Sequence, residues 1–285
     1  MNMFQRSWKI LKLSMDVMNK DKELLLFPII GGIFSLLFLI AMIFPVVIMA
    51  PASNAVGTGM SLYLLVFLIY FGLAMIATFF NTCIVYTVKT RFDGGNATFW
   101  DSIKFTLSKI HLVIAWGLIS ATVGLILRIL DEIADRMGGI GEIIIHILTS
   151  ILGAVWSIIT LFVIPAMIYH DIGPIKAIKK STQALKHTWG ESLIRYYGLG
   201  LVEIILLVIG VIVGIVLAVL TSQITALFYT VIIISLIYIV AVIVFFNLAN
   251  TIFNTALYVY ADTGKLPKAY DAEVIQNAFA KKKKE

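Results

Sequence analysis

Six long apolar stretches constrain this chain more than any other feature of its sequence. They cover residues 24–50, 60–88, 110–130, 143–169, 196–221 and 226–260. A helix of roughly 20 apolar residues crosses the ~30 Å hydrocarbon layer of a bilayer, and every stretch reaches that length. Backbone groups in lipid must find partners within the protein, and the short alternating segments of a barrel are missing. We therefore predict an all-α, polytopic membrane bundle of six transmembrane helices.

The composition excludes several other classes of protein. Hydrophobic residues make up 60% of the 285 residues, charged residues make up 13%, and the mean hydropathy is +1.00. Soluble domains are about 45–50% apolar and about 25% charged. A compact fold of this size in water would have to expose the excess apolar surface. The composition therefore argues against a soluble enzyme, a disordered protein and a nucleic-acid-binding protein.

The positions of the basic residues predict the orientation in the membrane. Twenty of the 22 lysines and arginines lie before the first stretch, between the second and third, between the fourth and fifth, or after the sixth. Only Arg128, near the end of the third stretch, and Arg136, in the loop that follows it, lie on the other side. Because short positively charged loops stay on the cytoplasmic side, we expect a multi-pass protein of the cell membrane with both termini in the cytoplasm. Residues 263–285 then form a basic cytoplasmic tail.

Three of the cytoplasmic segments share an apolar stripe at offsets 0, 3, 7 and 10, the spacing of one helix face. A lysine stands at offset 4 in each segment: Lys12, Lys104 and Lys179. We predict amphipathic helices in the inner headgroup layer, where these lysines contact anionic lipid. In the alternative interpretation they are connectors packed on the bundle. The stripes are Trp8-Leu11-Met15-Met18, Trp100-Ile103-Leu107-Ile110 and Ile175-Ile178-Thr182-Leu185, with Thr182 the one polar member.

The even-numbered stretches also end alike. Phe80-Asn81-Thr82 in the second stretch returns as Phe253-Asn254-Thr255 in the sixth. These patterns divide a single membrane domain, residues 1–285, into three units at 1–93, 94–171 and 172–262. A true duplication and the common features of interfacial helices both account for them. An Asp–Gly turn follows each even-numbered stretch, namely Asp93-Gly94, Asp171-Ile172-Gly173 and Asp262-Thr263-Gly264.

Glu203 is the only ionisable side chain well inside an apolar stretch. A carboxylate in a membrane is costly and needs a partner. Asn247, Asn250 and Asn254 fall on one side of the sixth helix, and Asn81 lies near the same leaflet. One hypothesis places these residues around a polar cavity open to the cytoplasm, in which Glu203 binds a cation or carries a proton. In the other, the amides join helices by hydrogen bonds and Glu203 reaches the interface.

Small residues and prolines indicate how the helices pack. Gly210, Gly214 and Ala218 form a small-xxx-small ridge on the fifth helix, which permits close packing within the chain, in a homo-oligomer or with a partner membrane protein. Pro28 and Pro165 stand near the cytoplasmic ends of their stretches, where each kinks or begins a helix.

No pattern in the sequence points to catalysis or to a cofactor. The HExxH, GxSxG, Walker A and GxGxxG motifs are absent, Cys83 is the only cysteine, and the four histidines lie far apart. Charged residues in 128–136 have the spacing of ion pairs along a helix extension, so we assign them no metal. The sequence therefore predicts no catalytic residue, no cofactor and no metal ligand, and we do not expect an enzyme.

Two segments carry a resemblance to known proteins. The run from Ser7-Trp8 to Asp21-Lys22-Glu23-Leu24-Leu25-Leu26-Phe27-Pro28 resembles the opening of a family of uncharacterised bacterial and archaeal multi-pass membrane proteins, a domain of unknown function. Gly173-Pro174-Ile175-Lys176-Ala177-Ile178-Lys179-Lys180-Ser181 is similar to a cytoplasmic-loop pattern shared more widely among such proteins. The resemblance implies a prokaryotic cytoplasmic-membrane protein of about six helices and implies no activity.

Two functional hypotheses remain open. The first is binding or passage of an ion or a small or lipidic ligand through the polar cavity near the inner leaflet. The second is a non-transporting scaffold or regulator that binds anionic lipid or partner membrane proteins.

Overall fold

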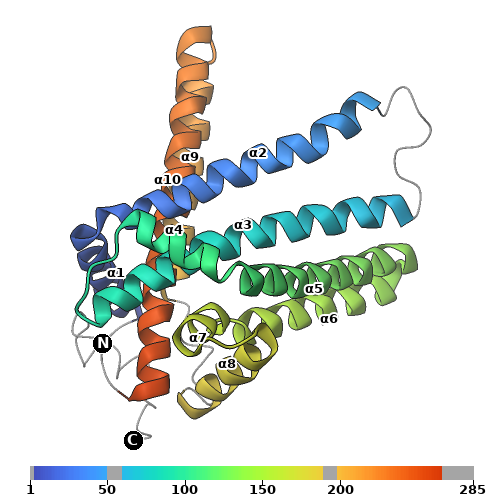
Figure 1. The fold of residues 1–285 in the computed structure, drawn as a ribbon. Helices are drawn as coiled ribbons and strands as arrows, with labels where there is room; N and C mark the ends of the chain where they lie inside the picture. Colours follow the sequence, from blue (N-terminus) through green and yellow to red (C-terminus); the bar gives the residue numbers. More distant parts are fainter. Residues whose placement is uncertain (1–2, 50–59, 189–197, 265–285) are drawn as a thin grey trace, which may run out of the picture. The chain divides into compact units, whose positions relative to one another are not determined.

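The computed structural model describes residues 3–49, 60–188 and 198–264 (Figure 1). Regular secondary structure in these ranges is helical throughout, which confirms the predicted all-α fold. The elements are α1 (Met3–Lys20), the 3-10 helix η1 (Lys22–Leu25), α2 (Leu26–Met49), α3 (Met60–Phe92), α4 (Phe99–Ser108), α5 (Ile110–Met137), α6 (Gly139–Ile159), α7 (Val163–His170), α8 (Pro174–Thr188), α9 (Gly198–Thr221) and α10 (Thr225–Thr263).

Six segments are long and apolar enough to cross a membrane, as predicted. Their surfaces present many large apolar side chains to the surroundings, such as Leu36 on α2 and Leu220 on α9. Such a surface is stable against hydrocarbon and not against water. The six segments are Lys22–Ile48, Met60–Phe92, Ile110–Met137, Gly139–His170, Val202–Leu220 and Thr225–Thr263.

The fourth segment is not the continuous helix expected over 143–169. α6 ends at Ile159, residues 160–162 form a turn, and α7 begins at Val163. Pro165 lies in the first turn of α7, where its missing N–H costs no hydrogen bond. The N–H of Phe162 in the turn donates to Ser181 Oγ at 3.2 Å. Pro28 likewise lies in the first turn of α2, so both prolines begin helices.

Each of the predicted Asp–Gly turns contains a residue with a left-handed backbone. Gly94 (φ 88°) follows α3, Asp171 (φ 51°) follows α7, and Gly264 (φ 68°) follows α10. Glycine adopts this conformation without steric cost, and aspartate tolerates it better than most residues. The turns therefore end these helices as a left-handed cap does.

The helices form two compact units. The terminal unit comprises residues 1–28 and 186–285, and the central unit comprises residues 29–185. In the terminal unit α9 packs along α10, and α1 packs against both. Leu11 and Met18 of α1 are buried, and Ser14 Oγ donates to the carbonyl oxygen of Ala249 on α10 at 3.4 Å.

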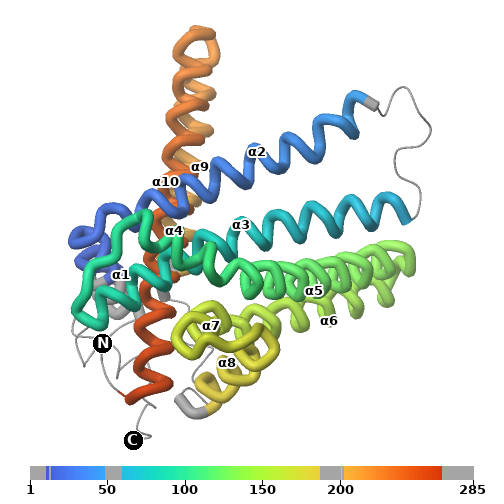
Figure 2. The backbone as a smooth tube through the Cα atoms, viewed as in Figure 1, coloured from blue at the N-terminus to red at the C-terminus, as the bar shows by residue number. Residues whose placement is uncertain are grey.

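The central unit is built on α3 and α5. α3 packs against α4, α5 and α7, and α5 packs against α6; Figure 2 shows α5 and α6 running side by side. The rings of Trp116 on α5 and Trp156 on α6 are stacked with their centroids 5.9 Å apart. A short turn at Gly138 joins these two helices, which makes them an antiparallel hairpin.

The three amphipathic helices share a buried hydroxyl six residues after the first member of the stripe. Ser14 occupies this position in α1, Thr106 in α4 and Ser181 in α8, and all three are fully buried. Thr106 Oγ1 lies 3.2 Å from Cys83 Sγ of α3, and Ser181 accepts the Phe162 N–H. The regularity agrees with a three-unit chain, which stays a prediction.

Candidate functional site

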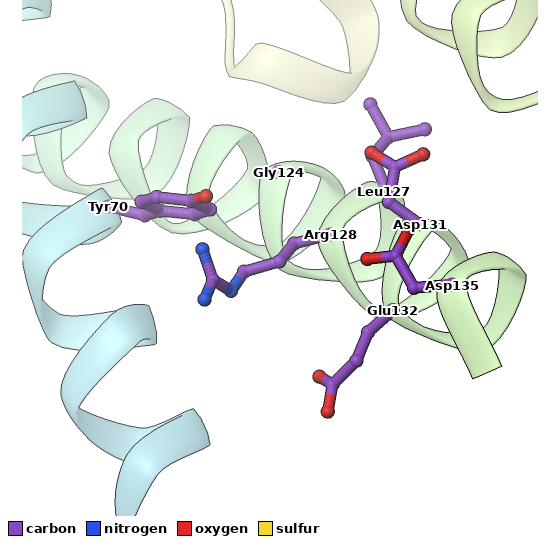
Figure 3. Close-up of a pocket in the computed structure, with 7 residues that line it drawn as sticks. All are labelled: Tyr70, Gly124, Leu127, Arg128, Asp131, Glu132 and Asp135. Carbon is purple, nitrogen blue, oxygen red and sulfur yellow. The ribbon is translucent and has the colours of Figure 1, made fainter. Parts of the chain in front are cut away.

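A polar pocket of about 430 Å³ lies in the central unit, where α5 approaches its end. Its walls come from α3 and α5, and four of its seven lining residues are charged. Figure 3 shows the Asp131 and Asp135 carboxylates on one side of α5, with the Glu132 carboxylate pointing elsewhere. The lining residues are Tyr70, Gly124, Leu127, Arg128, Asp131, Glu132 and Asp135.

The turn between α5 and α6 determines which residues meet beside this pocket. Gly138 and Gly139 both have positive φ, at 65° and 60°, which lets the chain reverse with one residue between the helices. In an antiparallel hairpin, residues equally distant from the turn face each other. Position 131 therefore pairs with 146, and position 135 pairs with 142.

His146 of α6 contacts two carboxylates of α5. Its Nδ1 lies 3.3 Å from Asp131 Oδ1, and its Nε2 lies 3.1 Å from Asp135 Oδ1. All three side chains are partly open to the surroundings. The imidazole is thus held at both nitrogens between acidic groups of the neighbouring helix.

A third acidic residue joins this cluster. The ligand-type atoms of Asp135, Glu142 and His146 lie within 4.8 Å of one another. Two carboxylates and one imidazole at this separation are groups that bind divalent metal ions. We call Asp131, Asp135, Glu142 and His146 the carboxylate–histidine cluster.

Glu132 belongs to a separate network. It accepts a hydrogen bond from Tyr63 Oη at 2.8 Å and pairs with Arg136 at 2.6 Å. Arg128 extends toward Tyr70 (Figure 3). Because Arg136 is paired with Glu132, the three carboxylates of the cluster are opposed chiefly by Arg128 and by any charge on His146. The cluster therefore favours a cation.

The charge spacing in residues 128–136 predicted the helix extension correctly, because α5 continues to Met137. The same spacing does not predict the cluster, because positions along α5 say nothing about α6. The available signal was the Gly138-Gly139 pair, which predicts a tight reversal and brings His146 beside Asp131.

The residues proposed for an inner cavity are placed as follows. Glu203 on α9 is half-buried and makes no hydrogen bond or ion pair in the ranges that the structure describes. On α10, Asn247 is exposed while Asn250 and Asn254 are half-buried. Asn81 lies on α3 in the central unit. In the described part of the terminal unit, Glu203 makes no hydrogen bond to the asparagines of α10. A polar cavity lined by these residues therefore stays a hypothesis.

The glycine ridge on α9 faces α10. A Cβ atom on Gly210 would overlap the Tyr238 ring, and one on Gly214 would lie 2.7 Å from Ser235 Oγ. Ala218 lines an apolar groove between the same two helices, together with Gly214. The ridge thus packs within the chain at Gly210 and Gly214.

The three lysines predicted to contact lipid, Lys12, Lys104 and Lys179, are exposed. The basic tail from residue 265 onward lies outside the described residues, as does the side chain of Trp8.

Comparison with protein families gives a match. The model of a family described as "Family of unknown function (DUF6159)" matches residues 60–267. This range contains the resembling segment 173–181 and leaves out the segment 7–28. No curated protein and no solved structure matches the chain.

Proposed function

The chain belongs to DUF6159, a family of unknown function, and from the geometry of its charged pocket we propose that it is a membrane protein that binds a divalent cation there. The observation that carries this proposal is the position of His146, held between Asp131 and Asp135 with Glu142 close by. The proposal keeps the ion-binding hypothesis and places the ion at the α5–α6 turn.

The two nitrogens of His146 suit different roles. A histidine ligand binds a metal through one ring nitrogen, and its other N–H is usually held by a carboxylate or carbonyl. Asp131 at Nδ1 is placed to hold the ring in this way. Nε2 then faces Asp135, which supplies the next ligand, and Glu142 supplies the third. Asp131 is in this scheme a positioning residue.

The donor set indicates the class of ion. One imidazole nitrogen and two carboxylate oxygens suit Zn²⁺ and related divalent transition metals, whereas Ca²⁺ and Mg²⁺ prefer oxygen ligands alone. Three protein ligands leave a coordination position for water or another group. The exposure of Asp135 gives an ion access from the aqueous side.

The inner-leaflet hypothesis has weaker geometric support. Glu203 is one carboxylate without a polar partner in the described ranges, and the three asparagines of α10 offer neutral oxygens only. A single carboxylate is a poorer cation site than three carboxylates and an imidazole.

Zinc titration of the purified full-length protein in detergent tests the proposal. We expect saturable binding by calorimetry and a rise in melting temperature, because a ligand that binds only the folded state stabilises it. H146Q and D135N should each abolish saturable binding. D131N should weaken the Zn²⁺ affinity roughly tenfold, as loss of a group that orients a ligand does.

E132Q is the matched control. Glu132 is on the same helix and one residue from Asp131, but it pairs with Tyr63 and Arg136. We expect E132Q to keep saturable Zn²⁺ binding, with at most a small loss of affinity because Arg136 loses its charged partner. Loss of binding in E132Q equal to that in D135N would indicate non-specific attraction to acidic residues and would overturn the proposal, as would the absence of saturable binding.

A further inference from the structure

The outward face of α4 carries large apolar side chains on both sides of a lysine. Trp100 is 66% exposed and Leu107 is 53% exposed, and the exposed Lys104 lies between them on the same face. The opposite face, with Ser102 and Thr106, is fully buried. This is the reverse of a helix on a water-soluble protein, which buries its apolar side chains and exposes its hydroxyls.

Contacts with α3 hold α4 in this orientation. Ser102 Oγ lies 2.7 Å from Thr87 Oγ1, and the rings of Phe105 and Tyr86 are stacked with centroids 4.0 Å apart. The first turn is closed by a capping box, in which Thr98 Oγ1 accepts the Asp101 N–H at 3.2 Å. Rotation of α4 to bury Trp100 would break these contacts. The packing of α4 on α3 therefore keeps Trp100 exposed.

α8 in the same unit presents a similar face. Ile175 is 77% exposed, and the exposed Lys179 follows it at i+4, as Lys104 follows Trp100. The buried face of α8 carries the small residues Ala177, Ser181 and Ala184, with Leu185 near its end. Both helices therefore combine an exposed apolar side chain with a lysine one turn away.

The position of α4 indicates what covers this face. α4 ends at Ser108 and the membrane-length helix α5 begins at Ile110, so α4 lies at the end of a membrane-spanning helix. Tryptophan is enriched at this level of a bilayer because its ring is apolar and its N–H is polar. This end of the central unit is also basic, with Lys89, Arg91, Lys104, Lys109, Lys176, Lys179 and Lys180 against Asp93, Asp101 and Asp171.

We propose that α4 and α8 bind the surface of an anionic bilayer. Trp100 and Ile175 enter the boundary between headgroups and acyl chains, and Lys104 and Lys179 contact lipid phosphates. The membrane layer that already surrounds α3 and α5 continues over these faces, and its negative charge complements the lysines. This inference is independent of the cation site at the opposite end of α5.

Lipid selectivity tests the electrostatic half of the proposal. Full-length protein is titrated with phosphatidylglycerol or phosphatidylcholine, and bound lipids are counted by native mass spectrometry. We expect a preference for phosphatidylglycerol that falls roughly fivefold for each lysine removed, in K104Q and K179Q. K104R with K179R is the matched control and should keep the preference. Equal binding of the two lipids, or an unchanged preference in K104Q/K179Q, would overturn the proposal.

The insertion of Trp100 is tested separately. The protein is reconstituted in vesicles whose acyl chains carry bromine close to the headgroup, and tryptophan fluorescence is compared between the unaltered protein and W100F. We expect the difference spectrum, which isolates Trp100, to be quenched. An unquenched Trp100 would mean that water or a protein partner covers α4, and the proposal would fail. Because W100F keeps an aromatic ring, loss of folding does not confuse this measurement.

Discussion

Lys109 Nζ lies 2.7 Å from both carboxylate oxygens of Asp171 and so ties the start of α5 to the end of α7. The hydrogen bonds from Lys109 hold the pKa of the Asp171 carboxyl below its ordinary value, and the charges of Lys109 and His111 act in the same direction. Asp171 also has the left-handed backbone that ends α7. The residue therefore combines an ion pair with a helix stop.

Replacing Asp171 with asparagine separates these two roles, because asparagine tolerates a left-handed backbone but carries no charge. We expect D171N to lower the melting temperature slightly at pH 7. A carboxyl whose pKa is depressed by folding stabilises the fold above its unfolded pKa of about 3.9, and this stabilisation is lost as the pH falls through the folded pKa. The difference between D171N and the unaltered protein should therefore close below about pH 4.

Thermal unfolding in detergent between pH 7 and pH 3 measures this difference. K109Q should behave as D171N does, and the double variant should be no less stable than either single variant. A stability difference that stays constant down to pH 3 would contradict the role of the ion pair.

Adding a methyl group at Gly210 should destabilise the α9–α10 pair. The Cβ of G210A would overlap the Tyr238 ring, whose hydroxyl donates to the Leu206 carbonyl at 3.2 Å. Overpacking of this kind costs about 1–3 kcal/mol. We expect a lower free energy of unfolding for G210A in denaturant titrations, and a much smaller loss when G210A is added to Y238A, in which the overlapping ring is gone.

G32A is the control for this prediction. A Cβ atom on Gly32 of α2 meets nothing within 4 Å, and alanine is the better helix former. The stability of G32A should equal or exceed that of the unaltered protein. Equal destabilisation by G32A and G210A would show that overlap with Tyr238 is not the cause.

Thr87 of α3 and Ser102 of α4 should be coupled in their contributions to the free energy of unfolding. Thr87 Oγ1 donates to the Cys83 carbonyl at 2.9 Å and lies 2.7 Å from Ser102 Oγ, with both residues buried. T87V takes this partner from Ser102, whose hydroxyl then has only the Thr98 carbonyl, at 3.2 Å, as a hydrogen-bond acceptor. The loss of one hydrogen bond of this kind costs about 0.5–1.5 kcal/mol. Removing both hydroxyls in T87V/S102A should cost less than the sum of the single losses.

A double-mutant cycle of unfolding free energies tests this coupling. S102A completes the cycle, and T90V is a control, because Thr90 bonds to the Tyr86 carbonyl of its own helix and is only part-buried. Additive effects of T87V and S102A would mean that the pair does not dock α4.

The six spans were predictable because lipid imposes one rule on every long apolar segment. The helix ends at Gly94 and Gly264 could also be predicted from the sequence, because the turns there need residues that adopt a positive φ. The break before α7 was not, because residues 160–162 are as apolar as a continuous span. In this turn the Phe162 N–H donates to Ser181, which lies 19 residues further along the chain and therefore could not be found from the local sequence.

The predicted and observed polar sites differ for a related reason. Glu203 stands out in the sequence because it is the one carboxylate in an apolar stretch. In the described ranges, however, no polar side chain lies close enough to bind it. His146 is inconspicuous because its partners Asp131 and Asp135 lie across the α5–α6 turn. Helix periodicity finds neighbours within one helix, whereas a site between helices requires their register.

The contact between Ser14 and Ala249 joins positions 235 residues apart and has a consequence for biosynthesis. α1 precedes α9 and α10 in the chain, so the surface against which it packs is complete only after both of these helices have been synthesised. During synthesis α1 therefore stays undocked until α10 has been made. Its docking closes the terminal unit, and a chain truncated before α10 keeps that helix undocked and exposed to quality control.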